Sequence, residues 1–166
     1  DLSFKLDFGN TPWGHFSLFG IGAASEIDFF GDDLDENDLF ANPNENAFPR
    51  SRIGIVDLRH SLILNNTSYL KTVVSTSANE SLFTQDNLLE NGDKLRVTEV
   101  EDLTRRIAVN SYWNKKFSAR TTLRTGAMLQ NIQLQSNVMD RDDRPDLDDD
   151  GLPDWFLVRD VDESLN

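Results

Sequence analysis

The residues best placed to do chemistry are acidic side chains near position 150. The stretch Asp146-Leu147-Asp148-Asp149-Asp150-Gly151-Leu152-Pro153-Asp154 places carboxylates at loop positions 1, 3, 5 and 9 and a glycine at position 6. Hard oxygen ligands at this spacing, with a glycine that permits a sharp turn, are typical of the first part of a calcium-binding loop. The candidate ligands of a Ca²⁺ ion are therefore Asp146, Asp148, Asp150 and Asp154. The alternative interpretation is a solvated acidic loop that binds no metal.

This loop departs from an EF-hand, because Leu157 stands at position 12, where a bidentate Glu is required. Its spacing resembles more closely the short Asp-rich calcium repeats of thrombospondin type 3 modules and related bacterial repeats. A second acidic run, from Asp32 to Asp38, lacks the spacing and the glycine, so we expect a solvated loop there, the alternative being contact with a cation or a ligand.

No arrangement of residues predicts an enzyme. The chain has no Cys, and neither of its two His residues, His15 and His60, has a second His or a nucleophile at a useful spacing. Ser61 and Ser75 have no companion base that the sequence identifies, so no catalytic triad is expected. No further cofactor is expected.

The net charge of −13 comes from two segments. Residues 26–46 hold 8 acidic side chains and no Lys or Arg, and residues 140–166 hold 11 acidic side chains against 3 basic ones. This balance argues against nucleic-acid binding, which requires a basic surface, and against a polybasic membrane anchor. We expect the two acidic segments to be mainly loops, whereas the rest of the chain has a slightly positive net charge.

The elements that position these residues are strands, because apolar and polar residues alternate with a period of two and no helical period appears. Val56, Leu58 and Leu62 point one way, for example, and Asp57, Arg59 and Ser61 the other. The Asn65-Asn66 pair predicts a tight hairpin. Strands are predicted at about 2–8, 14–30, 50–64, 67–81, 96–112 and 117–135, with a last short strand at 155–159.

The connections alternate between short ones, near 9–13, 65–66 and 113–116, and long ones, near 31–49, 82–95 and 136–154. Strands of about 15 residues exceed the usual ~5–6 of soluble sheets. This combination is typical of an outer-membrane β-barrel, although a soluble antiparallel sheet or sandwich alternates in the same way. Six or seven strands are too few to close such a barrel. We therefore predict an all-β antiparallel meander, residues 1–166 forming part of a barrel and, alone, an open curved sheet.

Two further expectations follow from the barrel interpretation. Aromatic residues near the short turns should form an interfacial girdle, and the arginines of the polar face should line the lumen. The girdle candidates are Phe8, Trp13, Phe16, Tyr69, Tyr112, Trp113 and Phe117, and the lumen candidates are Arg59, Arg106, Arg120 and Arg124. The chain opens without Met inside an alternating pattern, so we expect it to be part of a longer polypeptide.

Several stretches resemble barrel strands of TonB-dependent outer-membrane receptors of the Bacteroidota, of the type with a carboxypeptidase-regulatory-like N-terminal domain. They are residues 14–22, 54–62, 67–75 and the turn 114–120, and the resemblance covers about residues 1–135. It implies a 22-stranded barrel with an N-terminal plug, contact with outer-membrane lipid, and nutrient uptake driven by a TonB-type partner acting through the plug. No stretch of this sequence resembles a plug or a TonB box. The alternative is a soluble or cell-surface calcium-binding β module for adhesion.

Overall fold

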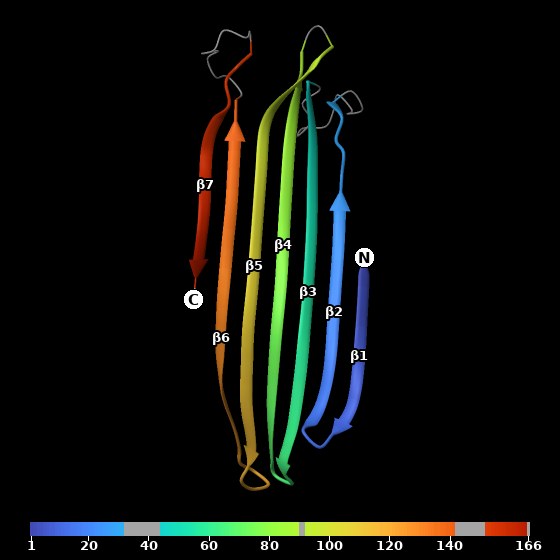
Figure 1. Cartoon of the computed structure of the whole chain (residues 1–166), viewed down its shortest axis with the longest axis vertical. Coiled ribbons are helices and arrows are strands. Elements are labelled where there is room, and N and C mark those ends of the chain that lie inside the picture. Colours follow the sequence, from blue (N-terminus) through green and yellow to red (C-terminus); the bar gives the residue numbers. More distant parts are fainter. Residues whose placement is uncertain (32–43, 90–91, 142–151, 166) are drawn as a thin grey trace.

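The computed structural model describes residues 1–31, 44–89, 92–141 and 152–165, and they form one antiparallel sheet with the strand order β1-β2-β3-β4-β5-β6-β7 (Figure 1). Every strand pairs with its neighbours in the chain, so the sheet is a meander, as the alternation predicted. The strands are β1 (Leu2–Thr11), β2 (Gly14–Glu26), β3 (Glu45–Asn65), β4 (Ser68–Leu88), β5 (Lys94–Lys116), β6 (Thr122–Asp140) and β7 (Phe156–Leu165). None of the described residues forms a helix long and apolar enough to cross a bilayer.

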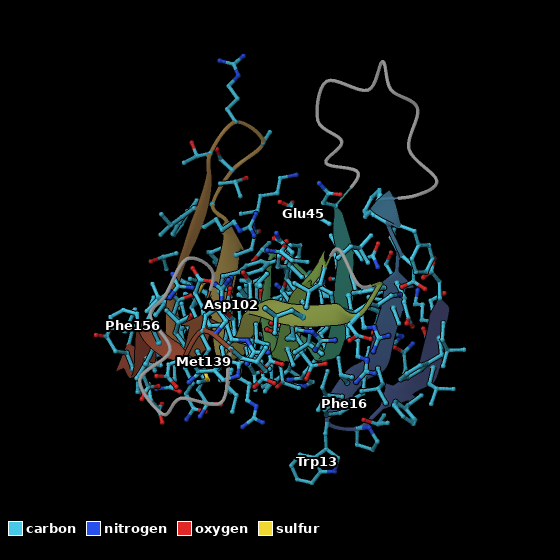
Figure 2. The ribbon with its side chains drawn as sticks, turned by 90° about the horizontal axis from the view of Figure 1, so that it is seen from above. Trp13, Phe16, Glu45, Asp102, Met139 and Phe156 are labelled. Atoms are coloured by element: carbon cyan, nitrogen blue, oxygen red, sulfur yellow. The ribbon has the colours of Figure 1, made fainter. Side chains whose placement is uncertain are left out.

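The sheet has a single layer, with side chains projecting from both of its sides (Figure 2). Among the described residues only Leu95, Val97 and Ala108 are buried apolar side chains. The hydrogen bonds between strands therefore hold the fold together, in place of a core between two layers.

The central strands are longer than the sequence pattern indicated. β3, β4, β5 and β6 contain 21, 21, 23 and 19 residues. Residues 82–95 were expected to form a long loop, but β4 continues to Leu88 and β5 begins at Lys94. Residues 45–49 and 136–140, which were expected to lie in the loops 31–49 and 136–154, likewise belong to strands. Polar residues continue a ladder wherever neither face must be buried, so polarity is a poor guide to where such a strand ends.

The short turns β1–β2, β3–β4 and β5–β6 lie together at one end of the sheet (Figure 1). At the β3–β4 turn the side chain of Asn65 accepts hydrogen bonds from the backbone N–H and the hydroxyl of Thr67, at 3.0 and 2.9 Å. The turn expected at 113–116 is displaced, because β5 runs on to Lys116 and residues 117–121 make the turn instead. There the N–H groups of Phe117 and Ser118 both donate to the carbonyl of Thr121.

The register divides the side chains into an apolar face and a polar face. Leu58, for example, pairs with Leu18 on one side and Val74 on the other, and Val74 pairs with Val109. We call the apolar side chains that share this face the apolar band: Leu2, Phe4, Leu6, Phe16, Leu18, Val56, Leu58, Leu62, Leu70, Val74, Ala78, Ile107, Val109, Trp113, Leu123, Ala127 and Leu129.

The apolar band crosses six strands and is tallest on the central ones. It extends from Val56 to Leu62 on β3 and from Leu70 to Ala78 on β4, which is about 20 to 27 Å at ~3.4 Å per residue. Polar side chains inside the band pair with each other: the hydroxyls of Thr72 and Ser111 lie 2.9 Å apart across β4 and β5. The hydrogen bond that the two hydroxyls share lowers the cost of placing them in an apolar environment.

Gly126 and Gly54 offer a test of how tightly the strands approach. A Cβ at Gly126 would lie 2.4 Å from the carbonyl oxygen of Ser111, whereas one at Gly54 would meet nothing within 4 Å. We predict that Gly126→Ala lowers the free energy of unfolding by about 1–3 kcal/mol, because the β5 backbone must shift. Gly54→Ala should leave it unchanged or raise it by up to about 1 kcal/mol. Denaturant titration measures both, and equal effects would contradict the register.

Candidate functional site

The predicted calcium ligands fall mostly outside the described residues. Asp146, Asp148 and Asp150 lie in the segment 142–151, which the structure does not describe, and Asp154 is half-buried in the approach to β7. Within residues 1–31, 44–89, 92–141 and 152–165, no group of three or more His, Asp or Glu side chains could hold a metal ion. The calcium loop therefore remains a prediction.

The polar face brings together three residues that the sequence analysis did not connect. His15 Nε2 lies 2.9 Å from Asp7 Oδ1, and His15 pairs with Ser61 in the β2–β3 register. The residue types match a Ser-His-Asp triad, but no hydrogen bond joins Ser61 to His15 among the contacts of the described residues. Backbone N–H groups here belong to the strand ladders, which leaves none to form an oxyanion hole. The contact between His15 and Asp7 connects β1 to β2, and it is an ion pair only when the imidazole is protonated.

His60 lies on the apolar face, between Leu58 and Leu62, and contacts the turn between β1 and β2. Its Nε2 donates to the carbonyl of Trp13 at 2.7 Å, and its ring stacks on Phe16 with the centroids 4.5 Å apart. Trp13 itself is 78% exposed and projects away from the sheet (Figure 2). This end of the apolar band thus presents an aromatic cluster.

The aromatic residues predicted to form the girdle do not all lie on the apolar face. Phe16 and Trp113 belong to the apolar band, but Tyr69 and Tyr112 lie on the polar face, where their rings make an edge-to-face contact 6.3 Å apart. Their inclusion was wrong, because it used proximity to a turn and ignored the alternation of side chains within a strand.

The four arginines predicted to line the lumen have different surroundings. Arg59 makes a bidentate pair with Asp57 two residues away, at 2.8 and 2.9 Å. Arg106 donates to the side-chain carbonyl of Gln130, and the guanidinium of Arg124 lies 3.8 Å from the centroid of the Tyr112 ring. Arg120 is in the 117–121 turn and not on a strand. Three of the four therefore occupy the polar face, each with a neighbour that fixes its position.

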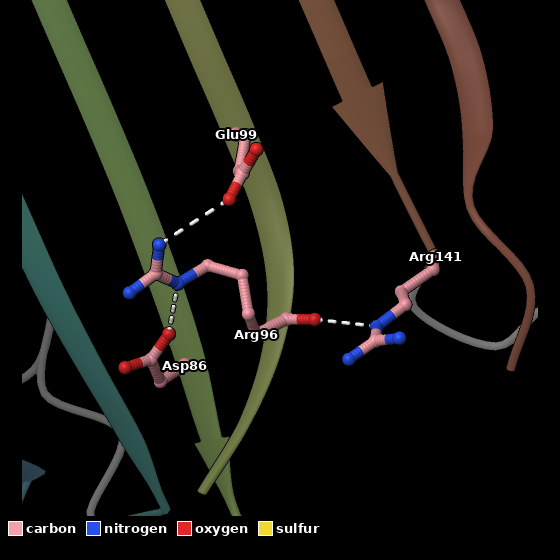
Figure 3. A network of polar contacts seen from close by, with 4 residues as sticks. All are labelled: Asp86, Arg96, Glu99 and Arg141. Atoms are coloured by element: carbon pink, nitrogen blue, oxygen red, sulfur yellow. Dashed lines mark hydrogen bonds and ion pairs between the residues drawn. The ribbon is translucent and has the colours of Figure 1, made fainter. Parts of the chain in front are cut away.

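A second polar cluster lies at the end of the sheet with the long connections, which we call the upper rim. Arg96 pairs with Asp86 on the neighbouring strand and with Glu99, at 3.3 Å, on its own strand (Figure 3). The Asp86 side chain is only 11% exposed. Its hydrogen bond raises the pKa of the Arg96 guanidinium above the ordinary value, so Arg96 stays charged at any working pH.

At the upper rim, the residues that follow β2 are bonded to the residues that begin β3. Buried Asn46 accepts a hydrogen bond from the N–H of Gly31 at 2.9 Å, and Phe29 pairs with Ala47 through two backbone hydrogen bonds. The Phe30 and Phe48 rings meet edge to face at 5.9 Å. The sequence analysis missed this rim cluster. The mixed charges of residues 86–99 were its signal, but residues 82–95 were interpreted as a loop and only the residues from 96 onward as a strand.

Arg96 and Arg52 allow a matched test of the rim. Arg96→Ala would leave the nearly buried carboxylate of Asp86 without its cation, so we predict a loss of about 1–3 kcal/mol of unfolding free energy. Arg52 pairs with Glu80 at 3.3 Å but is 69% exposed, so Arg52→Ala should cost about 0–1 kcal/mol. Denaturant titration compares the two, and an equal cost would show that the rim pair is not stabilising.

Comparison with known proteins adds no relative on which a function could rest. No protein-family model, no curated protein and no solved structure matches this chain.

Proposed function

We propose that this chain forms wall strands and extracellular ligand-contact loops of a TonB-dependent outer-membrane receptor for nutrient uptake, in a bacterium of the Bacteroidota. The observation that supports this most directly is the apolar band on one face of a single-layer sheet. Its height of about 20 to 27 Å matches the apolar belt of about 25 Å on outer-membrane barrels.

The single layer of the sheet and its exposed apolar side chains support a membrane wall over a soluble sandwich. A sandwich buries the inner faces of two sheets about 10 Å apart, but all seven strands described here belong to one sheet. Large side chains such as Leu129 and Leu6 are 74% and 50% exposed on the apolar face. Contact with lipid would remove these side chains from water without requiring a second protein layer.

The polar face supports a filled lumen over an open aqueous pore. Ile21 and Ile53 lie on this face and are each 46% exposed. Phe19 and Ile55 lie beside them in the register. Apolar side chains in this position favour packing against a solid element, which in the receptor family is the plug that receives the TonB-type partner. The short turns would then face the periplasm and the upper rim the exterior.

Leu58 and Ser75 provide the test of this proposal. Leu58 lies in the middle of the apolar band, and Ser75 lies one row away on the polar face. Leu58→Arg should cost about 2–4 kcal/mol of stability in lipid and strongly reduce assembly into outer membranes. Ser75→Arg should assemble like the parent protein. Membrane fractionation followed by urea unfolding in vesicles measures both effects.

Two outcomes would contradict the membrane proposal. One is Leu58→Arg assembling as well as Ser75→Arg. The other is a monodisperse, buffer-soluble monomer of this chain, which would favour the alternative of a soluble or cell-surface β module.

We further propose that Asp146, Asp148, Asp150 and Asp154 bind Ca²⁺, which would offset repulsion among the carboxylates of this acidic segment. Calcium should slow amide hydrogen exchange in residues 140–156, and a chelator should reverse the change. The double variant Asp148→Asn with Asp150→Asn should abolish the response, whereas Asp32→Asn with Asp33→Asn, in the run without calcium spacing, should retain it. Equal exchange with calcium and with chelator would eliminate the site.

A further inference from the structure

The apolar face contains an open hollow near the upper end of the apolar band, which we call the glycine hollow. Gly22 of β2 and Gly54 of β3 pair in the register and form its floor. A Cβ added at Gly54 would meet nothing within 4 Å, whereas one at Gly20 would overlap the ring of Phe4, which bounds one side. Ala78 of β4 bounds the other side, and the volume is about 330 Å³.

A smaller hollow of about 150 Å³, the arginine hollow, adjoins the glycine hollow across β4. Thr76 and Ala78 line both hollows. Arg105 of β5 and Gln133 of β6 pair in the register and line the smaller one. Because Arg105 also pairs with Ala78, its side chain lies on the apolar face. The two hollows therefore form one surface that changes from apolar to polar across β4.

Arg105 differs from the other arginines of the strands. Each of the others has an ion pair, a hydrogen bond or an aromatic ring as a partner. Arg105 is exposed and has no such partner among the residues that the structure describes. Glu80, one row higher on the same face, bonds to Arg52 at 3.3 Å instead. A charge beside hydrocarbon is costly unless a counter-charge meets it, so this position favours an anionic group.

Acidic side chains lie above this cation on the same face. Glu101 of β5 and Asp162 of β7 line the next groove toward the upper rim, together with Gln135. A second anionic group that extended in this direction would be repelled by the carboxylates. Carboxylates and amides such as Gln133 are instead suited to hydrogen bonds with hydroxyl groups. The surface thus fits an amphiphile that carries one anionic group and several hydroxyls.

We propose that this surface binds one molecule of a singly phosphorylated glycolipid. An acyl chain lies in the glycine hollow, the phosphate meets the guanidinium of Arg105, and sugar hydroxyls face Gln133 and Glu101. A guanidinium matches a phosphate in charge and in the geometry of its donors. The inference rests on the proposed function and names the lipid that the wall holds. In the proposed orientation the hollows lie toward the exterior, where the leaflet of an outer membrane consists of phosphorylated glycolipid.

Titration with monophosphoryl lipid A, followed by native mass spectrometry of the protein purified in detergent, tests the role of Arg105. Arg105→Gln should weaken binding about tenfold or more, the effect of losing hydrogen bonds to a charged group. Arg106→Gln provides the matched control, because this neighbouring arginine lies on the polar face beside Gln130. It should bind the lipid like the parent protein. Equal binding by Arg105→Gln and the parent would overturn the inference.

The glycine hollow has its own pair of variants. Gly54→Leu places a side chain in the hollow and should weaken binding of monophosphoryl lipid A about tenfold, because the acyl chain loses its apolar contacts. Ser75→Leu adds the same side chain on the polar face and should leave binding unchanged. Equal binding by these two variants would show that the hollow does not hold the lipid.

The choice of lipid separates one phosphate from two and a sugar from a glycerol. Bisphosphoryl lipid A should bind about fivefold more weakly than the monophosphoryl form, and Glu101→Gln should reduce this difference. Phosphatidylglycerol, which has one phosphate and no sugar, should also bind more weakly, and binding as tight as that of monophosphoryl lipid A would overturn the assignment to a glycolipid.

Assembly distinguishes this inference from the proposed function. Arg105→Gln and Gly54→Leu should reach outer membranes in the same amount as the parent protein. Normal assembly of a parent protein that does not bind monophosphoryl lipid A would overturn the lipid site and leave the membrane wall standing. A parent protein that does not enter outer membranes would overturn both.

Discussion

The structure depends on one continuous backbone ladder. Six pairings, all between strands adjacent in the chain, connect β1 to β7, and no second layer covers either face of the described residues. Only Leu95, Val97 and Ala108 are buried apolar side chains among them. Burial of apolar surface is the dominant favourable term in folding, so the surroundings of this sheet must provide most of it. Under the proposal of a membrane wall, the lipid that covers the apolar band supplies this burial.

Because no second layer covers the sheet, its polar side chains form hydrogen bonds and ion pairs with each other. Thr72 and Ser111 pair across strands inside the apolar band. On the polar face, Arg59 closes on Asp57 of its own strand, and Arg124 lies over the Tyr112 ring. Each pair is formed by residues that the ladder holds within reach, so the register determines the chemistry of both faces.

The same dependence explains what could be predicted from the sequence. The strands and the faces of residues such as Val56 and Leu58 follow from a period of two, and the order of the strands follows from the short connections, which are both local properties. Strand ends were misplaced because polar residues continue the ladder beyond the apolar band, as at Leu88 and Lys94. The Asp7–His15 and Asp86–Arg96 pairs could not be predicted, since each requires the pairing register, and the alternation pattern does not contain it.

The location of the uncompensated charge follows from the rim pairs. Arg50, Arg52, Arg96 and Arg159 each pair with an acid on or near the upper rim, so much of the acidity there is balanced within the sheet. Residues 32–43 hold 5 acids and no base, and residues 142–151 hold 6 acids and 1 base, which accounts for most of the net −13. The described residues on either side of both segments, Gly31 with Asn44 and Arg141 with Leu152, adjoin the strand ends of the upper rim and not the short turns. Under the proposed orientation, the uncompensated charge therefore belongs to the connections on the exterior side.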